Sequence, residues 1–176
     1  MRPTSDRARE ALFASLAEAV VGARVLDLCA GTGAVGLEAL SRGALSCAFV
    51  ESDGMACDAI RRNVGACGLE DRARVVRSDA LRYLDALPED TAFELVFADP
   101  PYSSTVLAGI ADRLDARPGL VAVGGLVVFE AGEEDMPGLS LKNHLCRWRR
   151  RYGAAWFALH ERVGDRDTAE EGNGRG

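Results

Sequence analysis

The sequence lacks any long hydrophobic run. None of its 176 residues belongs to an uncharged apolar stretch of the ~18 residues that a membrane span requires. The opening residues, Met1 to Asp6, contain no apolar segment of the kind found in secretory signals. We therefore expect a cytoplasmic protein with no membrane partner.

The sequence also lacks paired cysteines. Its five cysteines are an odd number, and none of them forms a C-x-x-C pair. This pattern argues against a disulfide framework and against a zinc site. We expect no bound metal and interpret the cysteines as small buried side chains in a reducing compartment.

An excess of positive charge is absent as well, because the net charge is −6. That balance argues mildly against nucleic-acid binding, since phosphate contacts need lysine and arginine. The cations are nevertheless clustered, at Arg2, Arg7 and Arg9 and again at Lys142 and 147–151. Either cluster is also typical of a solvated face. Residues 163–176 have little apolar content, so we expect one domain over 1–162 followed by a disordered acidic tail.

What the sequence does contain is an alternation of strands and helices. Short apolar runs predict strands at 24–29, 46–51, 73–77, 93–98 and 125–130. Helical spacing or start signals predict helices at 5–20, 34–41, 53–68, 79–87 and 104–114. Strand-like runs at 146–152 and 154–162 are too close together for a crossover, so they should be antiparallel. The pattern predicts an α/β, Rossmann-like fold with a mostly parallel sheet and an antiparallel hairpin at one edge.

A glycine-rich loop follows the first predicted strand. Residues 31–36 read Gly-Thr-Gly-Ala-Val-Gly and open a helix, which is the arrangement that binds dinucleotides, although a tight turn without ligand has the same pattern. Asp27 lies four positions earlier and, if it points into the ligand crevice, would repel a pyrophosphate. A cofactor with an amino group, a sulfonium and no phosphate suits it better. The loop therefore favours S-adenosylmethionine.

Two further acids end predicted strands. Glu51 follows Gly31 by 20 residues and could accept hydrogen bonds from a ribose diol, in either kind of cofactor. Asp79 could accept the adenine amino group. The alternatives are a solvent-facing carboxylate for Glu51 and an ordinary helix N-cap for Asp79.

The most informative residues are Asp99, Pro100, Pro101 and Tyr102, which follow the fourth predicted strand. Two successive prolines remove two backbone donors and fix two φ angles, which makes the segment rigid. The Asp99 carboxylate and the Pro100 carbonyl could grip the two N–H groups of a nucleobase amine. Gripped in this way, the nitrogen lone pair would be aimed at a methyl group, and both acceptors would stabilise the developing positive charge. Tyr102 offers a flat face for an extruded base.

These residues resemble the RsmD family over the stretch from Arg2 to about Glu161. The resemblance is carried by Arg2-Pro3-Thr4, Asp6-Arg7, Arg9-Glu10, Leu12-Phe13, Leu26-Asp27, Ala30-Gly31-Thr32-Gly33, 36–44, Val50-Glu51-Ser52-Asp53, Asn63, Ala98-Asp99-Pro100-Pro101-Tyr102 and Tyr152-Gly153. It implies a class I S-adenosylmethionine-dependent methyltransferase fold, with a seven-stranded sheet whose last strand is antiparallel. It also implies methylation of the N2 amine of a guanine in 16S ribosomal RNA, within the small subunit or its assembly intermediate.

The resemblance implies roles for individual positions too. The catalytic positions would be Asp99, Pro100, Pro101 and Tyr102, and the cofactor positions Asp27, Ala30, Gly31, Gly33, Glu51, Ser52, Asp79 and Ala80. Members of the family carry a further basic, glycine-rich segment ahead of the Arg-Pro-Thr stretch that helps to hold RNA, whereas this sequence opens at that stretch. The basic run at 147–151 is a candidate substitute if it faces the crevice. We expect a monomer.

Three alternatives remain open from the residues. The Asp-Pro-Pro-Tyr motif is shared with enzymes that methylate adenine N6 or cytosine N4, so another DNA or RNA amine could be the acceptor. A dinucleotide-dependent oxidoreductase would use the same glycine loop. A non-catalytic module that binds S-adenosylmethionine and has lost its RNA-binding arm would retain the cofactor residues alone.

Overall fold

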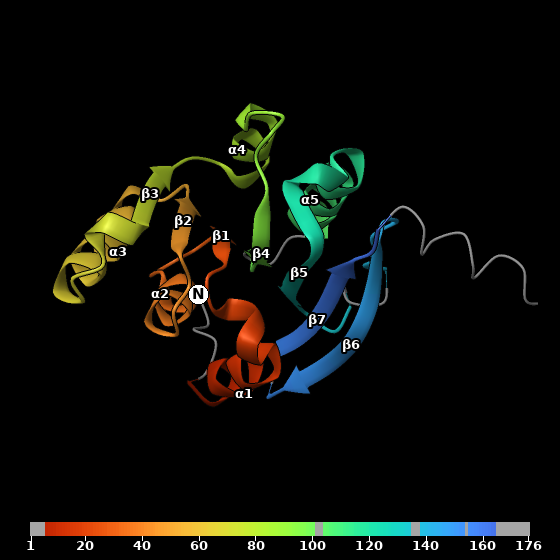
Figure 1. Ribbon diagram of the computed structural model, residues 1–176, viewed down its shortest axis with the longest axis horizontal. Helices are drawn as coiled ribbons and strands as arrows, with labels where there is room; N and C mark the ends of the chain where they lie inside the picture. The colour runs from red at the N-terminus through yellow and green to blue at the C-terminus, as the bar shows by residue number, and fades with distance from the viewer. Residues whose placement is uncertain (1–5, 101–103, 135–137, 154, 165–176) are drawn as a thin grey trace, which may run out of the picture.

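The computed structural model describes residues 6–100, 104–134, 138–153 and 155–164, and its centre is one seven-stranded sheet (Figure 1). The strands are β1 (Arg24–Leu28), β2 (Ser46–Glu51), β3 (Ala73–Arg77), β4 (Phe93–Ala98), β5 (Val121–Ala131), β6 (His144–Tyr152) and β7 (Ala155–Arg162). Their order across the sheet is β3-β2-β1-β4-β5-β7-β6. Only β7 runs antiparallel to its neighbours, which confirms the predicted mostly parallel sheet with an antiparallel last strand.

The helices cover both faces of this sheet. They are α1 (Asp6–Leu16), α2 (Ala34–Ser41), α3 (Gly54–Ala66), α4 (Ala80–Ala86) and α5 (Ser104–Ala116). Short 3₁₀ turns lie at Ala17–Val20, Glu70–Arg72 and Pro118–Leu120. Leu84 and Ile110 place α4 and α5 in one core cluster, whereas Phe13, Leu40 and Ile60 place α1, α2 and α3 in the other. Among the described residues, no helix has the length and apolar character to span a membrane.

The alternating burial of the strands explains why the sheet needs both layers. In β1, Val25 belongs to the core beneath α1, α2 and α3, while Leu26 and Leu28 belong to the core beneath α4 and α5. Successive strand side chains point to opposite faces, so a strand covered on both sides reads as continuously apolar. This is why the buried strands were recognisable as short apolar runs.

Two element boundaries differ from the predicted ones by four residues, and the others by no more than two. The predicted helix 5–20 ends at Leu16, where Ala17 has a φ of 41° and a 3₁₀ turn follows. The predicted strand 125–130 begins earlier, at Val121, because the pairing of β4 with β5 shifts register between Phe93 and Leu95 and Gly124 has a φ of 77°. An irregularity of this kind interrupts the apolar periodicity, so the sequence pattern showed only the regular part of β5.

The strand order fixes where a ligand can bind. From β1 the chain winds outward through β2 to β3, and it then returns to place β4 on the other side of β1. Ligands of such sheets bind at the carboxyl ends of the strands where the winding direction reverses. The turns that follow β1 and β4 contain the glycine loop and Asp99-Pro100, so both predicted motifs reach this point.

The close packing of α2 on β2 gives a test of the fold. A Cβ at Gly36 would lie 2.3 Å from Phe49 Cε1 and 2.7 Å from Cys47 Sγ, whereas a Cβ at Gly65 would meet only Glu70 Oε1 at 3.6 Å. We expect Gly36→Ala to lower the free energy of unfolding by ~1–3 kcal/mol through overpacking. Gly65→Ala, also within a helix, should raise it by up to ~1 kcal/mol. Urea denaturation checks both, and equal effects would contradict the packing of α2 on β2.

Candidate active site

The glycine loop between β1 and α2 has the backbone conformation that its sequence predicts. Cys29, Gly31 and Gly33 have φ values of 61°, 57° and 81°, in the left-handed region that glycine tolerates best. Gly31 and Gly33 are buried, and a Cβ at Gly33 would lie 3.1 Å from Ile60 Cγ1. The loop therefore passes tightly over α3 before α2 begins at Ala34.

The buried side chain of Asp27 is hydrogen-bonded to the last glycine of this motif. Its side chain is 4% exposed and its Oδ2 accepts a hydrogen bond from the backbone N–H of Gly36 at 3.0 Å. Burial raises the pKa of Asp27 to about 7, the Gly36 hydrogen bond opposes this shift, and the nearby Glu51 carboxylate adds to it. The structure thus places Asp27 in contact with the glycine loop itself, and its contact with a cofactor stays a prediction.

Glu51 ties the end of β2 to the same loop. Its Oε2 accepts the backbone N–H of Gly31 at 2.8 Å. Its Oε1 accepts the N–H of Asp53 at 2.9 Å and the Ser52 hydroxyl at 3.3 Å. The side chain is partly exposed, but both of its oxygens accept hydrogen bonds from neighbouring turns, so it does not face water alone. Glu51 instead joins two turns that border one edge of the sheet.

Asp79 and Asp53 are helix N-caps. Asp79 Oδ1 accepts the N–H groups of Leu81 and Arg82 at 3.0 and 3.1 Å, which is the ordinary capping role that the sequence left open. Asp53, rather than Ser52, caps α3 by accepting from Ala56 N–H at 2.8 Å. Ala80 is buried at the start of α4. Cofactor contacts of Ser52, Asp79 and Ala80 remain predictions.

Asp99 follows β4 directly and lies beside the end of β1. Its backbone N–H donates to the carbonyl of Leu28 at 3.4 Å, which continues the pairing of the two strands past Ala98. Burial of the carboxyl group raises the pKa of Asp99 to about 8, and the carboxylates of Glu130 and Asp27 add to the shift. Because Asp99 as a whole residue is exposed, the upward direction depends on those two neighbours as well as on burial of the carboxyl group. Pro100 is buried, while Pro101 and Tyr102 lie outside the described residues.

The acids near the ends of four strands all lie close to the Cys29 thiol. Burial raises the pKa of Cys29 to about 12, and Glu51, Asp99, Asp27 and Asp79 contribute to the shift. These four carboxylates lie within two residues of the ends of β2, β4, β1 and β3, and all are close enough to act on a single side chain in the glycine loop. Neither Cys29 nor Glu130 belongs to a motif that marks it in the sequence, and Glu130 lies one residue before the end of β5.

This arrangement limits which ligand the edge can hold. Four converging carboxylates would repel a pyrophosphate and attract a cation. They also supply acceptors for hydroxyl and amino groups, and the tight glycine turn allows a ligand close to the backbone. The residues present therefore fit S-adenosylmethionine, with its amino group, ribose and sulfonium, better than they fit a dinucleotide.

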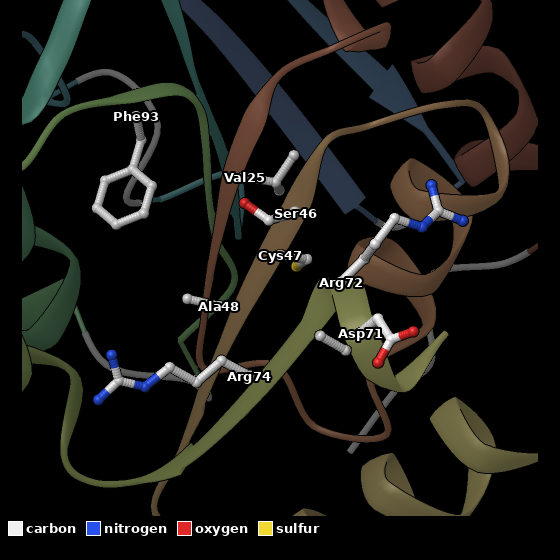
Figure 2. A pocket seen from close by; sticks show the side chains of 9 residues that line it. Val25, Ser46, Cys47, Ala48, Asp71, Arg72, Arg74 and Phe93 are labelled. Carbon is white, nitrogen blue, oxygen red and sulfur yellow. The ribbon is translucent and has the colours of Figure 1, made fainter. Parts of the chain in front are cut away.

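A pocket lies at the opposite edge of the sheet from these acids. It has a volume of about 280 Å³ and is lined by Val25, Ser46, Cys47, Ala48, Asp71, Arg72, Ala73, Arg74 and Phe93 (Figure 2). These residues belong mostly to the amino ends of β1–β4, the opposite edge of the sheet from Asp99. Arg72 and Arg74 extend from it to different sides, and Arg72 is held by the carbonyls of Leu40 and Ala44. The acids converge at the other edge of the sheet, near the carboxyl ends of β1–β4.

Known proteins are similar to this chain in sequence and in fold. The model of a family described as "Conserved hypothetical protein 95" matches residues 1–161. The chain is 33% identical over 164 residues to a putative rRNA methyltransferase, YlbH, of Bacillus subtilis, covering 93% of this chain and 89% of that protein. It is 37% identical over 135 residues to the ribosomal RNA small subunit methyltransferase D of Escherichia coli, covering 77% of this chain and 66% of that protein.

Solved structures agree with these sequence matches. A putative methyltransferase, yhhF, from Escherichia coli superposes with a TM-score of 0.82 at 33% identity, covering 93% of this chain and 89% of that one. A hypothetical protein of Thermus thermophilus superposes with a TM-score of 0.74 at 37% identity, covering 91% and 88% of the two chains. The chain belongs to the family described as "Conserved hypothetical protein 95", the RsmD family, and its fold and cofactor are those of class I S-adenosylmethionine-dependent methyltransferases.

Proposed function

We propose that this protein transfers a methyl group from S-adenosylmethionine to the exocyclic N2 amine of a guanine in 16S ribosomal RNA. The observation that carries the proposal is the convergence of Asp27, Glu51, Asp79 and Asp99 around the glycine loop. The relatives named as ribosomal RNA small subunit methyltransferases support the choice of RNA. The proposed setting is the cytoplasm, on the small subunit or its assembly intermediate, with the protein acting as a monomer.

The cofactor residues divide into three groups by their proposed roles. Asp27 and Glu51 hold the glycine loop through Gly36 and Gly31, and Glu51 presents its remaining acceptor capacity to the ribose hydroxyls. Ser52, Asp79 and Ala80, at the starts of α3 and α4, border the adenine, while Ala30, Gly31 and Gly33 border the methionine portion. S-adenosylmethionine, when bound, supplies a methyl group on a positively charged sulfur.

The residues after β4 hold the acceptor amine. Asp99 and the Pro100 carbonyl accept its two N–H groups, and Tyr102 stacks on the base. With both hydrogens gripped, the nitrogen lone pair is directed at the methyl carbon, so much of the barrier is removed by orientation. The positive charge that develops on nitrogen is stabilised by Asp99 and the carbonyl dipole. The methylated amine then loses one proton to water, and no strong base is needed.

The proposal is tested with small ribosomal subunits from a strain that lacks the endogenous enzyme. Labelled S-adenosylmethionine is added, and the modified nucleoside is identified after digestion of the RNA. We expect N2-methylguanosine in 16S RNA. A labelled adenine or cytosine would replace the guanine in the proposal, and normal cofactor binding without any labelled RNA or DNA would favour a non-catalytic module.

The substitution Asp99→Ala tests whether Asp99 holds the acceptor amine. We expect Asp99→Ala to lower kcat for methyl transfer by ~10²–10³-fold, because a preorganised acceptor at the developing charge is lost. Its affinity for S-adenosylhomocysteine should stay within about tenfold of the wild-type value, or ~1.4 kcal/mol. If calorimetry shows that cofactor affinity falls as far as kcat, Asp99 supports the fold of the site and does not hold the amine.

The charge of the site predicts a pH-dependent preference between the two forms of the cofactor. The raised pKa of Asp99 leaves the carboxyl group partly protonated near neutrality, and a bound sulfonium favours its charged form. Binding S-adenosylmethionine should therefore release a proton, so that its affinity rises with pH and levels off above the raised pKa.

S-adenosylhomocysteine lacks the sulfonium charge and should respond less to pH. We expect the ratio of its Kd to that of S-adenosylmethionine to rise by up to about tenfold per pH unit below the raised pKa. Titrations at several pH values measure this ratio, and Asp99→Asn is the control that should flatten it. A ratio independent of pH in the wild-type protein would show that the carboxylates do not sense the sulfonium.

A further inference from the structure

The edge strand β6 is strongly and uniformly basic. Between Asp135 and Glu161 the sequence contains five cationic residues, Lys142, Arg147, Arg149, Arg150 and Arg151, and no acidic one, in a protein whose net charge is −6. All four arginines lie on β6 and are exposed. Charged side chains of either sign would protect an exposed strand from pairing with other chains, so protection alone does not explain why the charge is entirely positive.

Three of these arginines are not neutralised by an ion pair with any described carboxylate. Arg147 forms an ion pair with Glu161, Nε to Oε2 at 2.6 Å. Within the described part of the chain, Arg149, Arg150 and Arg151 have no carboxylate at ion-pair distance. Arg149 and Arg151 each donate to a backbone carbonyl, of Leu139 at 2.7 Å and of Gly153 at 2.8 Å, which positions the guanidinium groups without neutralising them.

Arg150 is positioned by an aromatic ring. Its Cζ lies 4.8 Å from the ring centroid of Trp148. Trp148 is packed against the core beneath α1, α2 and α3, so the ring that orients Arg150 is itself fixed. A guanidinium held flat on a ring keeps its N–H edge free, and its fork geometry matches two oxygens of a phosphate.

The register places this strand end at the catalytic edge. Ala98 pairs with Phe129, so Asp99 follows at the level of Glu130, and Glu130 pairs with Phe157, which pairs with Arg150. Asp99 and Arg150 therefore lie in one row across the sheet, three strand spacings or about 14 Å apart. In Figure 1 the end of β6 lies on the outer side of the sheet, and α3 flanks the opposite side.

The acids around Cys29 and the arginines of β6 suit two different parts of a nucleic acid, its base and its phosphate backbone. The acids around Cys29 repel phosphates, so the backbone of a substrate whose base enters this site needs cations elsewhere, a few nucleotides away. On α1, Arg9 is already paired with Asp6 and Glu38. The end of β6 supplies three arginines that keep their charge at the required edge.

We infer that the end of β6 binds the phosphate backbone of the RNA substrate through Arg149, Arg150 and Arg151, beside the nucleotide that is methylated at Asp99. This inference rests on the proposed function. It assigns RNA positioning to a strand at the sheet edge, with Trp148 as the support of Arg150.

The test compares two double substitutions that remove the same charge. Arg150→Gln with Arg151→Gln changes β6, and Arg61→Gln with Arg62→Gln changes exposed arginines on α3, beyond the other edge of the sheet. For the β6 variant we expect a KM for RNA raised about tenfold, with kcat at saturating RNA and affinity for S-adenosylhomocysteine unchanged. The slope of log affinity against log salt should fall by ~1.4, as for two lost contacts to single-stranded RNA. The α3 variant should match the wild-type protein.

Direct binding keeps this test separate from the test of the function. Fluorescence anisotropy with a labelled 16S RNA fragment is measured for all three proteins, so the surface is judged even if the wild-type protein transfers no methyl group. An unchanged RNA affinity in the β6 variant, or an equal loss in the α3 variant, would overturn the inference. So would a change in oligomeric mass confined to the β6 variant, which would show that this strand contacts a second copy of the chain.

Discussion

The mutual repulsion of carboxylates at one edge of the sheet is the constraint on which the site depends. Asp27, Glu51, Asp79 and Asp99 all act on the Cys29 thiol, and Asp27 and Asp99 themselves have raised pKa values. Such a cluster is costly unless backbone N–H groups or a cation compensate it. Gly36 and Gly31 supply part of the compensation through their hydrogen bonds to Asp27 and Glu51, and a cationic cofactor bound at this edge would supply more.

The same hydrogen bonds shape the glycine loop, so binding and folding are coupled there. Glu51 joins the loop after β1 to the turn before α3, and Asp27 joins β1 to the first turn of α2. The tight contact of Gly36 with Phe49 fixes α2 against β2 beneath the loop. A ligand at this edge therefore meets a backbone that is already held in place, which lowers the ordering cost of binding.

The acidic cluster at the strand ends is separated from the basic edge strand β6. The acids converge near the ends of β1 to β4, while β6 contains three arginines without an ion-paired carboxylate among the described residues, and one of them, Arg150, lies in the same row as Asp99. In the proposed function, an acceptor base and a polyanionic backbone have opposite electrostatic needs, and the row from Asp99 to Arg150 would meet them about 14 Å apart, three strand spacings away. The net charge of −6 conceals this separation.

The sequence by itself determined the alternation of strands and helices, the glycine loop, the acids at the strand ends and the antiparallel hairpin. Apolar runs, glycines and prolines act locally, so their meaning can be read without the rest of the chain. The irregular start of β5 escaped prediction because a register shift depends on the neighbouring strand. Only the tertiary structure decided that Asp27 is buried next to the loop, that Asp79 caps α4, that Glu130 acts on Asp99 and that the end of β6 lies in the same row as Asp99. Each of these depends on which strands become neighbours, and strand order is set by packing between segments far apart in the sequence.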